Sequence, residues 1–280
     1  MSNFPEKEAA HIRILCLGDV VGRPGRRVIK ERVAHLRKRL ALDMVIANGE
    51  NAAGGIGLTP ETLRELLGAG VDVVTSGNHI WKHQEMWPYL DKETRVLRPE
   101  NYGASVPGRG WGVYALPCGV RVGVLNLLGR VYMDPADSPF LAADAVMDAL
   151  RAEEAAIVLV DFHADASSEK RAMAQYLDGR ASVVFGTHTH VQTADAHVTD
   201  AGTACVSDVG MCGVEFESVI GMGKAAVLKR FSSGLPQPFS PARGRAGLNG
   251  LLVDIEPATG RAERVALLRD KPALFLAADE

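Results

Sequence analysis

The chain has 280 residues, of which 47% are hydrophobic and 23% charged, and its 31 basic and 34 acidic side chains leave a net charge of −3. This balance excludes a disordered chain, a coiled coil and a collagen-like fibre. It also lacks the basic surplus of proteins that bind nucleic acids or anionic membranes through their net charge, so we expect no membrane association and no stable nucleic-acid complex.

The first third of the chain alternates between short apolar runs and amphipathic stretches. Apolar residues of the stretch 23–40 recur at helical spacing on one face, which predicts a helix. Thr59 and Pro60 are typical of the N-cap and the first position of a second helix. The predicted elements are strands over 12–17, 44–47 and 71–75, and helices over 23–40, from 60 to 68–70, and around 84–90. This β-α-β-α-β order predicts a parallel sheet with right-handed crossovers.

The rest of the chain adds a hairpin, further α/β units and a strand-rich end. A turn at Pro117-Cys118-Gly119 separates two apolar runs, over 111–116 and 120–127, and predicts the hairpin. Downstream we predict helices over 141–155, 168–177 and near 224–231, and strands over 157–162, 182–185, 197–199, 204–206, 250–256 and 264–268. Residues 232–249 are rich in Gly, Pro and Ser and are interpreted as a long surface loop joining two strands, or as a flap over a site.

Neither a repeat nor a linker divides the chain into two cores. We therefore expect an α/β protein with a single domain over residues 12–280, preceded by a flexible extension over 1–11. The cysteines at 16, 118, 205 and 212 form no C-x-x-C pair and indicate reduced thiols of an intracellular protein. The first ten residues lack the apolar core of a signal peptide, and no apolar run is long enough to span a membrane, so we expect a cytoplasmic protein.

Polar residues follow five of the predicted strands at the point where each strand ends. In a parallel sheet these ends meet at one edge, which is where ligands bind in α/β proteins. The residues are Asp19 after the first strand, Glu50 and Asn51 after the second, Asn78 and His79 after the third, His163 after the fourth, and His188 and His190 after the fifth. This recurrence is the strongest functional signal in the sequence.

Each of these positions is weak evidence alone. A Gly18-Asp19 pair after a strand is more often a turn or a helix cap, and a lone histidine such as His163 is more often a hydrogen-bonded structural residue. The pair His188-x-His190 is stronger, because alternate residues of a strand point to the same side and can place both imidazoles near one centre. Five such strand ends in succession indicate a site.

The candidate ligands combine carboxylate and amide oxygens with imidazole nitrogens and include no thiolate. Such a set suits Mn²⁺, Fe²⁺ or Zn²⁺ better than Ca²⁺. Seven donor groups exceed what one ion uses, whereas two ions with a bridging carboxylate would use all of them. Paired metals about 3.5–4 Å apart recur in enzymes that hydrolyse phosphate esters.

Three arginines, Arg23, Arg26 and Arg27, open the predicted helix over 23–40. They could contact a substrate phosphate, but a solvated helix start is the simpler interpretation. The Gly22-x-x-Gly25 spacing there does not match a phosphate-binding loop and is assigned to helix packing.

Six segments carry a resemblance to a known family: GDVVGRPGR, NGENAAGGIGLT, SGNHIW, DFHADASSEK, GTHTHVQTAD and MCGVEFESVIG, in this order. They resemble the YmdB-like branch of the calcineurin-like metallophosphoesterases, from about residue 12 to the C-terminal strands. GNH followed by a strand-end His and an H-x-H is specific to the superfamily, and GDVVG with NGEN is specific to the branch. The resemblance implies a four-layer α/β/β/α sandwich of metallophosphoesterase type with mixed sheets.

The same resemblance implies a dinuclear metal site. One ion would be held by Asp19, Glu50, Asn51 and His190, and the other by Glu50, Asn78, His163 and His188, with Glu50 as the bridge. A hydroxide between the ions would attack phosphorus, and His79 would protonate the leaving oxygen. Because family members resemble cyclic-nucleotide phosphodiesterases, we expect hydrolysis of 2′,3′-cyclic nucleotides, with 3′,5′-cyclic nucleotides as further candidates.

Two positions depart from the pattern of the wider superfamily. The usual D-x-H after the first strand is Asp19-Val20-Val21 here, so one imidazole is missing, and the usual Asp of the second motif is Glu50, beside Asn51. Both departures match the branch. Because fewer nitrogen ligands weaken the case for zinc, we expect iron first and manganese next, with zinc or magnesium as alternatives.

Two other functions stay open from the sequence. One is a regulatory protein that binds metal and nucleotide with little turnover, and the other is a phosphomonoesterase or 5′-nucleotidase. The expected partners are a small phosphodiester substrate and phosphate as a product-like ligand. The resemblance also implies association with further copies of this chain in a homo-oligomer.

Overall fold

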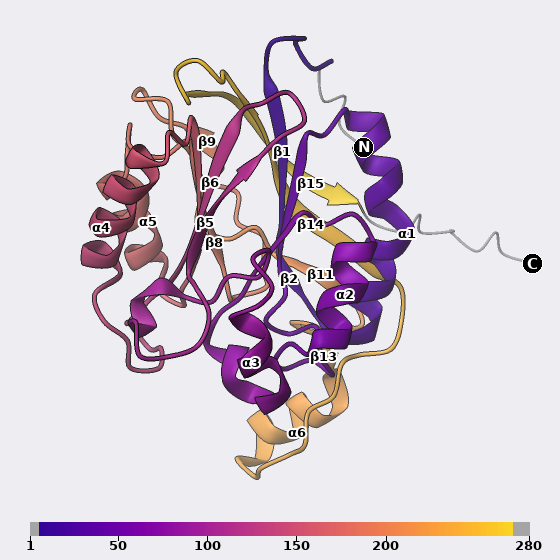
Figure 1. The fold of residues 1–280 in the computed structure, drawn as a ribbon. Helices are drawn as coiled ribbons and strands as arrows, with labels where there is room; N and C mark the ends of the chain where they lie inside the picture. Colours follow the sequence, from indigo (N-terminus) through magenta and orange to yellow (C-terminus); the bar gives the residue numbers. More distant parts are fainter. Residues whose placement is uncertain (1–5, 271–280) are drawn as a thin grey trace, which may run out of the picture.

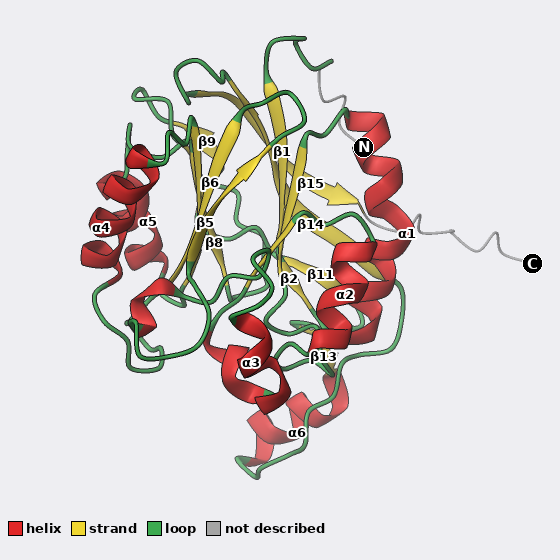
Figure 2. Ribbon diagram, viewed as in Figure 1, coloured by secondary structure: helices red, strands yellow, loops and turns green. Residues whose placement is uncertain are grey.

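Two mixed β-sheets with helices on their outer sides make up residues 6–270, the part of the chain that the computed structural model describes (Figures 1 and 2). The seven-stranded sheet has the order β2-β11-β14-β1-β3-β4 with β15 beside β14, and the six-stranded sheet has the order β5-β6-β7-β8-β10-β9. A separate hairpin joins β12 and β13. Of the extension predicted over 1–11, residues 1–5 lie outside the described part.

The strands of the seven-stranded sheet are β1 (Ile12–Leu17), β2 (Asp19–Val20), β3 (Met44–Asn48), β4 (Val73–Thr75), β11 (Met211–Val214), β14 (Ala246–Ile255) and β15 (Ala262–Asp270). The six-stranded sheet contains β5 (Trp111–Ala115), β6 (Arg121–Leu128), β7 (Ile157–His163), β8 (Val183–Thr187), β9 (His197–Val198) and β10 (Ala204–Val206), and the hairpin pairs β12 (Ser218–Val219) with β13 (Met222–Gly223). The α-helices are α1 (Gly22–Leu40), α2 (Pro60–Gly68), α3 (Trp87–Leu90), α4 (Pro139–Ala152), α5 (Ser167–Tyr176) and α6 (Lys224–Ser233). Short 3₁₀ helices cover Asn78–Lys82, Gln84–Met86 and Glu100–Tyr102.

Side-chain alternation along the strands places the apolar residues in three layers. In β1, Leu15 and Leu17 pack toward α1 and α2, whereas Ile14 and Cys16 pack toward the six-stranded sheet. The same alternation in the six-stranded sheet turns residues such as Phe162 outward to α4 and α5. The two sheets therefore face each other across one apolar layer, with a helical layer outside each sheet (Figure 2).

Most of the predicted elements are confirmed. Strands β1, β3 and β4 are parallel, and β5 and β6 pair antiparallel as the predicted hairpin. Thr59 caps α2, since its side chain accepts a hydrogen bond from the Thr62 amide, and Pro60 is the first helical residue. In residues 6–270 the four cysteines are free, and no helix is long and apolar enough to cross a membrane.

Two predicted segments differ from the structure, and several short strands were not predicted. Residues 84–90 form a 3₁₀ turn and the four-residue helix α3, not one helix. The loop predicted over 232–249 is shorter and connects a helix to a strand, because α6 continues to Ser233 and β14 already begins at Ala246, where β11 pairs with it. Strands β2, β11, β12 and β13 were not predicted, since each is short and forms only by pairing, β2 with β11, β11 also with β14, and β12 with β13.

A buried ion pair joins β1 to β14 on the helical side of the seven-stranded sheet. Arg13 and Asp254 are directly opposed in the two antiparallel strands. Arg13 donates from Nε to Asp254 Oδ1 at 2.6 Å and from Nη2 to Asp254 Oδ2 at 2.7 Å. It also donates to the Leu40 carbonyl at the end of α1 at 3.2 Å, so one guanidinium ties a helix and two strands together.

We expect Asp254→Ala to lower the free energy of unfolding by about 3–5 kcal/mol, because it leaves the Arg13 charge buried without its partner. Urea denaturation followed by circular dichroism measures this loss. Asp148→Ala is the matched control, since its ion pair with Arg151 is exposed on α4 and contributes at most about 1 kcal/mol. Equal effects of the two substitutions would contradict a structural role for the buried pair.

Candidate metal centre

Polar side chains replace apolar ones between the two sheets at the carboxyl ends of the parallel strands. Along β7, Ile157 and Leu159 pack in the layer between the sheets. Since alternate strand residues point to the same side, Asp161 and His163 continue on that side toward the end of the strand. Asn48 at the end of β3 and Thr187 at the end of β8 meet them there. The apolar layer thus ends in a buried polar site.

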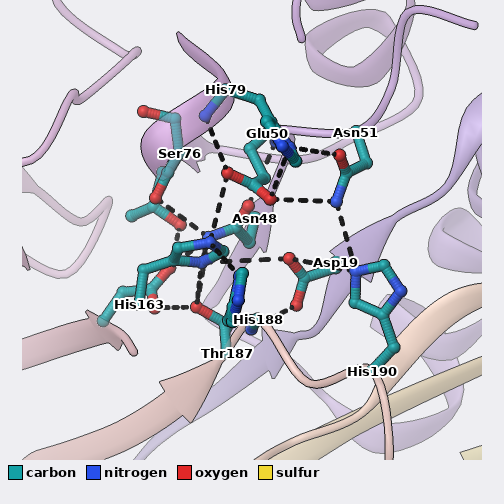
Figure 3. A network of polar contacts seen from close by, with 12 residues as sticks. Asp19, Asn48, Glu50, Asn51, Ser76, His79, His163, Thr187, His188 and His190 are labelled. Carbon is teal, nitrogen blue, oxygen red and sulfur yellow. Dashed lines mark hydrogen bonds and ion pairs between the residues drawn. The ribbon is translucent and has the colours of Figure 1, made fainter. Parts of the chain in front are cut away.

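Glu50 lies at the centre of this site and is fully buried (Figure 3). Its Oε2 lies 3.1 Å from His163 Nε2, which in turn lies 3.1 Å from His188 Nδ1. The ligand atoms of these three residues all lie within 4.8 Å of one another. Gly77 permits this approach, because a Cβ there would lie 2.3 Å from both Glu50 Oε2 and His163 Nε2.

Asp19, Asn51 and His190 form a second group beside Glu50 (Figure 3). Asn51 Nδ2 donates to Glu50 Oε1 at 3.0 Å and lies 3.2 Å from His190 Nε2. His190 Nε2 also lies 3.7 Å from Asp19 Oδ1. Asp19 Oδ2 accepts from the His188 amide at 3.0 Å, which connects the two groups.

The structural reason given for the His188-x-His190 pair is wrong. Strand β8 ends at Thr187, and both histidines follow it with left-handed backbone, at φ 100° for His188 and 65° for His190. The two imidazoles therefore do not share one side of a strand. His188 faces His163, and His190 faces Asp19. A turn distributes the pair over both groups of the site.

The ring nitrogens that point away from the site have acceptors of their own. His190 Nδ1 donates to the Ile220 carbonyl at 2.8 Å. His163 Nδ1 lies 2.8 Å from Thr187 Oγ1, and the Thr187 hydroxyl donates to Asp161 Oδ1 at 2.7 Å, so His163 is the donor to Thr187. Each Nδ1 therefore carries a hydrogen, so each Nε2 would present a lone pair to a cation bound in the site when the ring is neutral. Metal-ligating histidines are typically oriented in this way.

Two oxygens at the strand ends are buried without any hydrogen-bond partner among the described residues. They are Asp19 Oδ1, which faces His190, and Asn78 Oδ1, whose residue precedes His79 in the chain. A buried polar atom without a partner is costly, and a bound cation is one way to satisfy such an oxygen. Together with the imidazole lone pairs, these oxygens fit a divalent transition metal. We use the term strand-end cluster for Asp19, Glu50, Asn51, Asn78, His163, His188 and His190.

The charges of the cluster also fit bound cations. Burial acts to raise the pKa of Glu50, but His163 and His79 outweigh it and hold that pKa well below its usual range. Burial and the charge of His163 lower the pKa of His188 to about 4, which keeps it neutral. Burial opposes protonation of His190, yet the charge of Asp19 raises its pKa to about 9. Protonated histidines thus neutralise the carboxylate charge that a bound metal ion would neutralise in their place.

His79 lies beside the cluster at the start of the 3₁₀ helix Asn78–Lys82. Its Nδ1 lies 2.9 Å from Asn51 Oδ1 and 3.1 Å from Glu50 Oε1. Both oxygens are acceptors, so Nδ1 carries a hydrogen. His79 is 32% exposed, and its Nε2 has no hydrogen-bond partner within residues 6–270. This nitrogen can exchange a proton with a ligand bound at the cluster.

Comparison with known proteins identifies the family. A sequence profile described as YmdB-like protein matches residues 15–268. The 2′,3′-cyclic-nucleotide 2′-phosphodiesterase of Bacillus subtilis is 42% identical over 266 residues, which cover 94% of this chain and 100% of that protein. The chain belongs to the YmdB-like protein family.

Solved structures agree with this assignment. A crystal structure described as a novel phosphatase from Mycoplasma pneumoniae superposes on this YmdB-like chain with a TM-score of 0.86 at 33% identity, covering 94% of this chain and 95% of that one. The 5′-nucleotidase precursor of Thermus thermophilus has a TM-score of 0.57 at 12% identity, covering 93% of this chain and 54% of that one. At that identity the likeness shows the fold alone, which is a mixed α/β fold of the 5′-nucleotidase type.

Four residues that support the cluster were not predicted from the sequence: Asn48, Asp161, Thr187 and Asp208. Asp161 could have been found, because it lies two residues before His163 on a predicted strand and so shares its side. Asp208 follows β10, and the strand-end rule applied to residues 204–206 would have identified it. Asn48 Oδ1 accepts from the Glu50 amide at 3.1 Å, a local contact that composition and spacing do not reveal.

Asp208 holds the turn between the two histidines of the H-x-H motif. Its Oδ2 accepts from the Thr189 amide at 3.0 Å and from the Thr189 hydroxyl at 2.7 Å. The same oxygen accepts from Lys170 Nζ at 2.7 Å, and both charged side chains are buried. Lys170 from α5 and Asp208 therefore anchor Thr189, and with it the left-handed backbone of His188 and His190.

We expect Asp208→Ala to weaken metal binding by about 10–100-fold, because it releases the turn that presents His188 and His190. Titration of the metal-free protein with Mn²⁺ measures this affinity, and a thermal melt of the metal-free protein reports the separate loss of the buried ion pair. Asp195→Ala is the control, since Asp195 bonds Ser207 and Thr193 on the same segment but does not contact Thr189. Unchanged Mn²⁺ affinity in folded Asp208→Ala would refute the anchoring role.

Proposed function

We propose that this YmdB-like chain is a metal-dependent phosphodiesterase that hydrolyses 2′,3′-cyclic nucleotides by breaking the bond from phosphorus to O2′. The observation that carries this proposal is the position of His79, whose Nε2 is unpartnered beside a buried cluster of carboxylate, amide and imidazole ligands. The 42% identical relative, a 2′,3′-cyclic-nucleotide 2′-phosphodiesterase, supports the choice of substrate. The product would be a nucleoside 3′-phosphate.

Two ions would be shared by the strand-end cluster. Asp19, Glu50, Asn51 and His190 would hold one, and Glu50, Asn78, His163 and His188 would hold the other, with Glu50 between them. Iron is our first choice and manganese our second. Bound ions of this kind lower the pKa of water and neutralise the charge on phosphoryl oxygens. The unpartnered oxygens of Asp19 and Asn78 and the short contacts around Glu50 support this division.

His79 would act as the general acid. As water adds to phosphorus and the bond to O2′ breaks, His79 would give O2′ the proton held at Nε2. Asn51 and Glu50 orient the ring through its Nδ1, which leaves Nε2 on the open side.

The remaining expectations belong to the same proposal. The helical layers outside the two facing sheets support an α/β/β/α sandwich of metallophosphoesterase type. The single domain over residues 12–280 belongs to the same proposal, and its residues 271–280 lie outside the described part of the chain. Hydrolysis of 3′,5′-cyclic nucleotides, a homo-oligomeric assembly and a cytoplasmic location remain predictions from the sequence.

Elemental analysis of the purified protein tests the dinuclear site. We expect about two transition-metal ions per chain in the wild type. Glu50→Ala removes the shared carboxylate, so the content should fall well below one ion per chain. Glu65→Ala, which removes an exposed carboxylate on α2, should leave the content unchanged. Full metal content in a folded Glu50→Ala variant would contradict the bridging role.

Steady-state kinetics of His79→Ala test the general acid. We expect kcat for 2′,3′-cyclic AMP to fall by about 10²–10⁴-fold, because the leaving O2′ loses its proton donor, while metal content stays at the wild-type level. His83→Ala is a matched control, since this half-buried histidine lies four residues along and, among residues 6–270, bonds the Ile56 carbonyl through Nε2 and contacts no residue of the cluster. Its kcat should stay within about twofold of the wild type.

The same assay separates the alternative functions. Phosphate release from nucleoside monophosphates by the metal-loaded wild type, without turnover of cyclic nucleotides, would replace the proposal with a phosphomonoesterase. Nucleotide binding that survives His79→Ala, again without turnover, would indicate a binding protein.

A further inference from the structure

Two neighbouring hollows of about 430 and 680 Å³ lie along the first turns of α1. The first lies between α1 and the C-terminal half of α2, helices that run side by side in Figure 1. The second lies between the start of α1, the turn at Gly54 and residues 241–244. We call them together the basic groove, after the cationic residues that line it: Arg23, Arg26, Arg27, Lys30, Arg64 and Arg243.

The positive charge of the basic groove is poorly compensated. Its lining contains one acidic residue, Glu65, which pairs with Arg26. Arg27 has a loose contact of 3.5 Å with Glu31, and both side chains are more than half exposed. Arg23, Lys30, Arg64 and Arg243 have no carboxylate within 4 Å among residues 6–270. In a chain of net charge −3, this is a local concentration of cations that a solvated helix start does not require.

The helix itself adds to this potential. The first turn of α1 contains no acidic residue, so the positive end of the helix dipole is not neutralised there. Guanidinium groups bind phosphate oxygens in bidentate geometry, which makes an arginine-rich surface selective for phosphate. No aromatic side chain lines either hollow, so the surface offers contacts to a backbone without a stacking platform for bases.

The basic groove is connected to the strand-end cluster by a short piece of chain. Gly54 lines the groove and is three residues after Asn51, a span of at most about 11 Å. The Gly22 amide donates to the Asn51 carbonyl at 2.8 Å, and Arg26 Nη1 donates to the Ala52 carbonyl. The start of α1 is thereby bound directly to the segment that carries Glu50 and Asn51.

We infer that the basic groove binds the phosphodiester backbone of a single-stranded oligoribonucleotide whose 2′,3′-cyclic phosphate end enters the strand-end cluster. This inference rests on the proposed function and extends it from free nucleotides to RNA ends. A cyclic mononucleotide has one phosphate, which the cluster itself would take, so it offers no second phosphate to the cations of the groove. A 2′,3′-cyclic phosphate forms only on ribose, and at the 3′ end of a strand it is preceded by further phosphates.

The chemistry at the strand end is the same as for a mononucleotide. Water adds to phosphorus, the bond to O2′ breaks, and O2′ takes a proton, which leaves the strand with a 3′-phosphate. Because the groove contacts only the backbone, binding should not depend on sequence and should weaken with salt. It would be a weak engagement of a short strand, consistent with the absence of a basic surplus in the whole chain.

The test compares two substrates of the metal-loaded protein, 2′,3′-cyclic AMP and a six-nucleotide RNA that ends in a 2′,3′-cyclic phosphate. We expect the wild type to have a kcat/KM at least tenfold higher for the RNA at low salt. In the triple variant Arg27→Ala, Lys30→Ala, Arg64→Ala, kcat/KM for the RNA should fall by about tenfold or more, while that for cyclic AMP stays within about twofold. None of these three side chains contacts the strand-end cluster.

A variant with the same change of charge serves as the control. This second triple variant removes three cations from the far end of α1 and from α4, through Lys38→Ala, Arg39→Ala and Arg151→Ala. It should leave kcat/KM for both substrates unchanged. The salt dependence gives a second readout, since three lost phosphate contacts should reduce the slope of log affinity against log salt by about 2 for a single strand. Fluorescence anisotropy of the RNA product with its 3′-phosphate measures that affinity without turnover.

The outcomes separate this inference from the proposed function. Two results would show that the groove does not bind the RNA, while leaving the proposed phosphodiesterase activity intact. One is hydrolysis of cyclic AMP with no preference for the RNA, and the other is an equal loss of kcat/KM for both substrates in the triple variant. Turnover of neither substrate would overturn the phosphodiesterase. The anisotropy titration would then decide the groove alone, and equal RNA binding by the wild type and the triple variant would overturn it.

Discussion

The carboxylate of Asp161 is buried at the point where the two sheets meet, and it requires hydrogen-bond donors there. Asn48 and Thr75 of one sheet and Thr187 of the other donate hydrogen bonds to it. Burial raises its pKa to about 6, against the opposing charge of His163. A carboxylate without these donors would be costly in this position, so the registers of β3, β4, β7 and β8 are coupled to one another. Glu50, Asn78, His163 and His188 follow or end those same strands, so the packing of the sheets positions the residues that we propose as metal ligands.

The ligands beyond the strands depend on a different kind of support. His188 and His190 have left-handed backbone conformations, which residues other than glycine rarely adopt. The buried pair of Lys170 and Asp208 holds Thr189 between them, and the Ile220 carbonyl orients His190. Ile220 itself has a positive φ of 46°, which is rare for a β-branched residue. Strain therefore concentrates where the chain leaves the sheet to enclose the site, while the strand-borne ligands carry none of it.

Much of this arrangement can be predicted from residue order. Period-2 and period-3.6 patterns identify β1, β3, α1 and α2, and the rule that ligands follow parallel strands brings Asp19, Glu50 and His163 to one edge. The rule failed where a residue acts through a partner distant in sequence. Alternation along β7 places Asp161 on the same side as His163 but does not reveal the donors from the other sheet, and β2 and β11 form only by pairing with each other and, for β11, with β14. The side on which His188 and His190 face depends on backbone torsions that spacing alone does not encode.

The two places where this chain can bind phosphate draw their positive charge from different sources. The strand-end cluster contains carboxylates with pKa values lowered by neighbouring histidines, so without cations it repels an anionic ligand unless those histidines are protonated. The basic groove takes its positive charge from the protein's own side chains. On our proposals, a phosphate-rich strand would reach the groove whether or not metal is present, whereas its terminal phosphate would bind in the cluster only after metal has neutralised Asp19 and Glu50. The net charge of −3 conceals this separation, because it averages a cationic helix start with an acidic remainder. Charge distribution, and not total charge, is the property of this sequence that bears on which phosphates it binds.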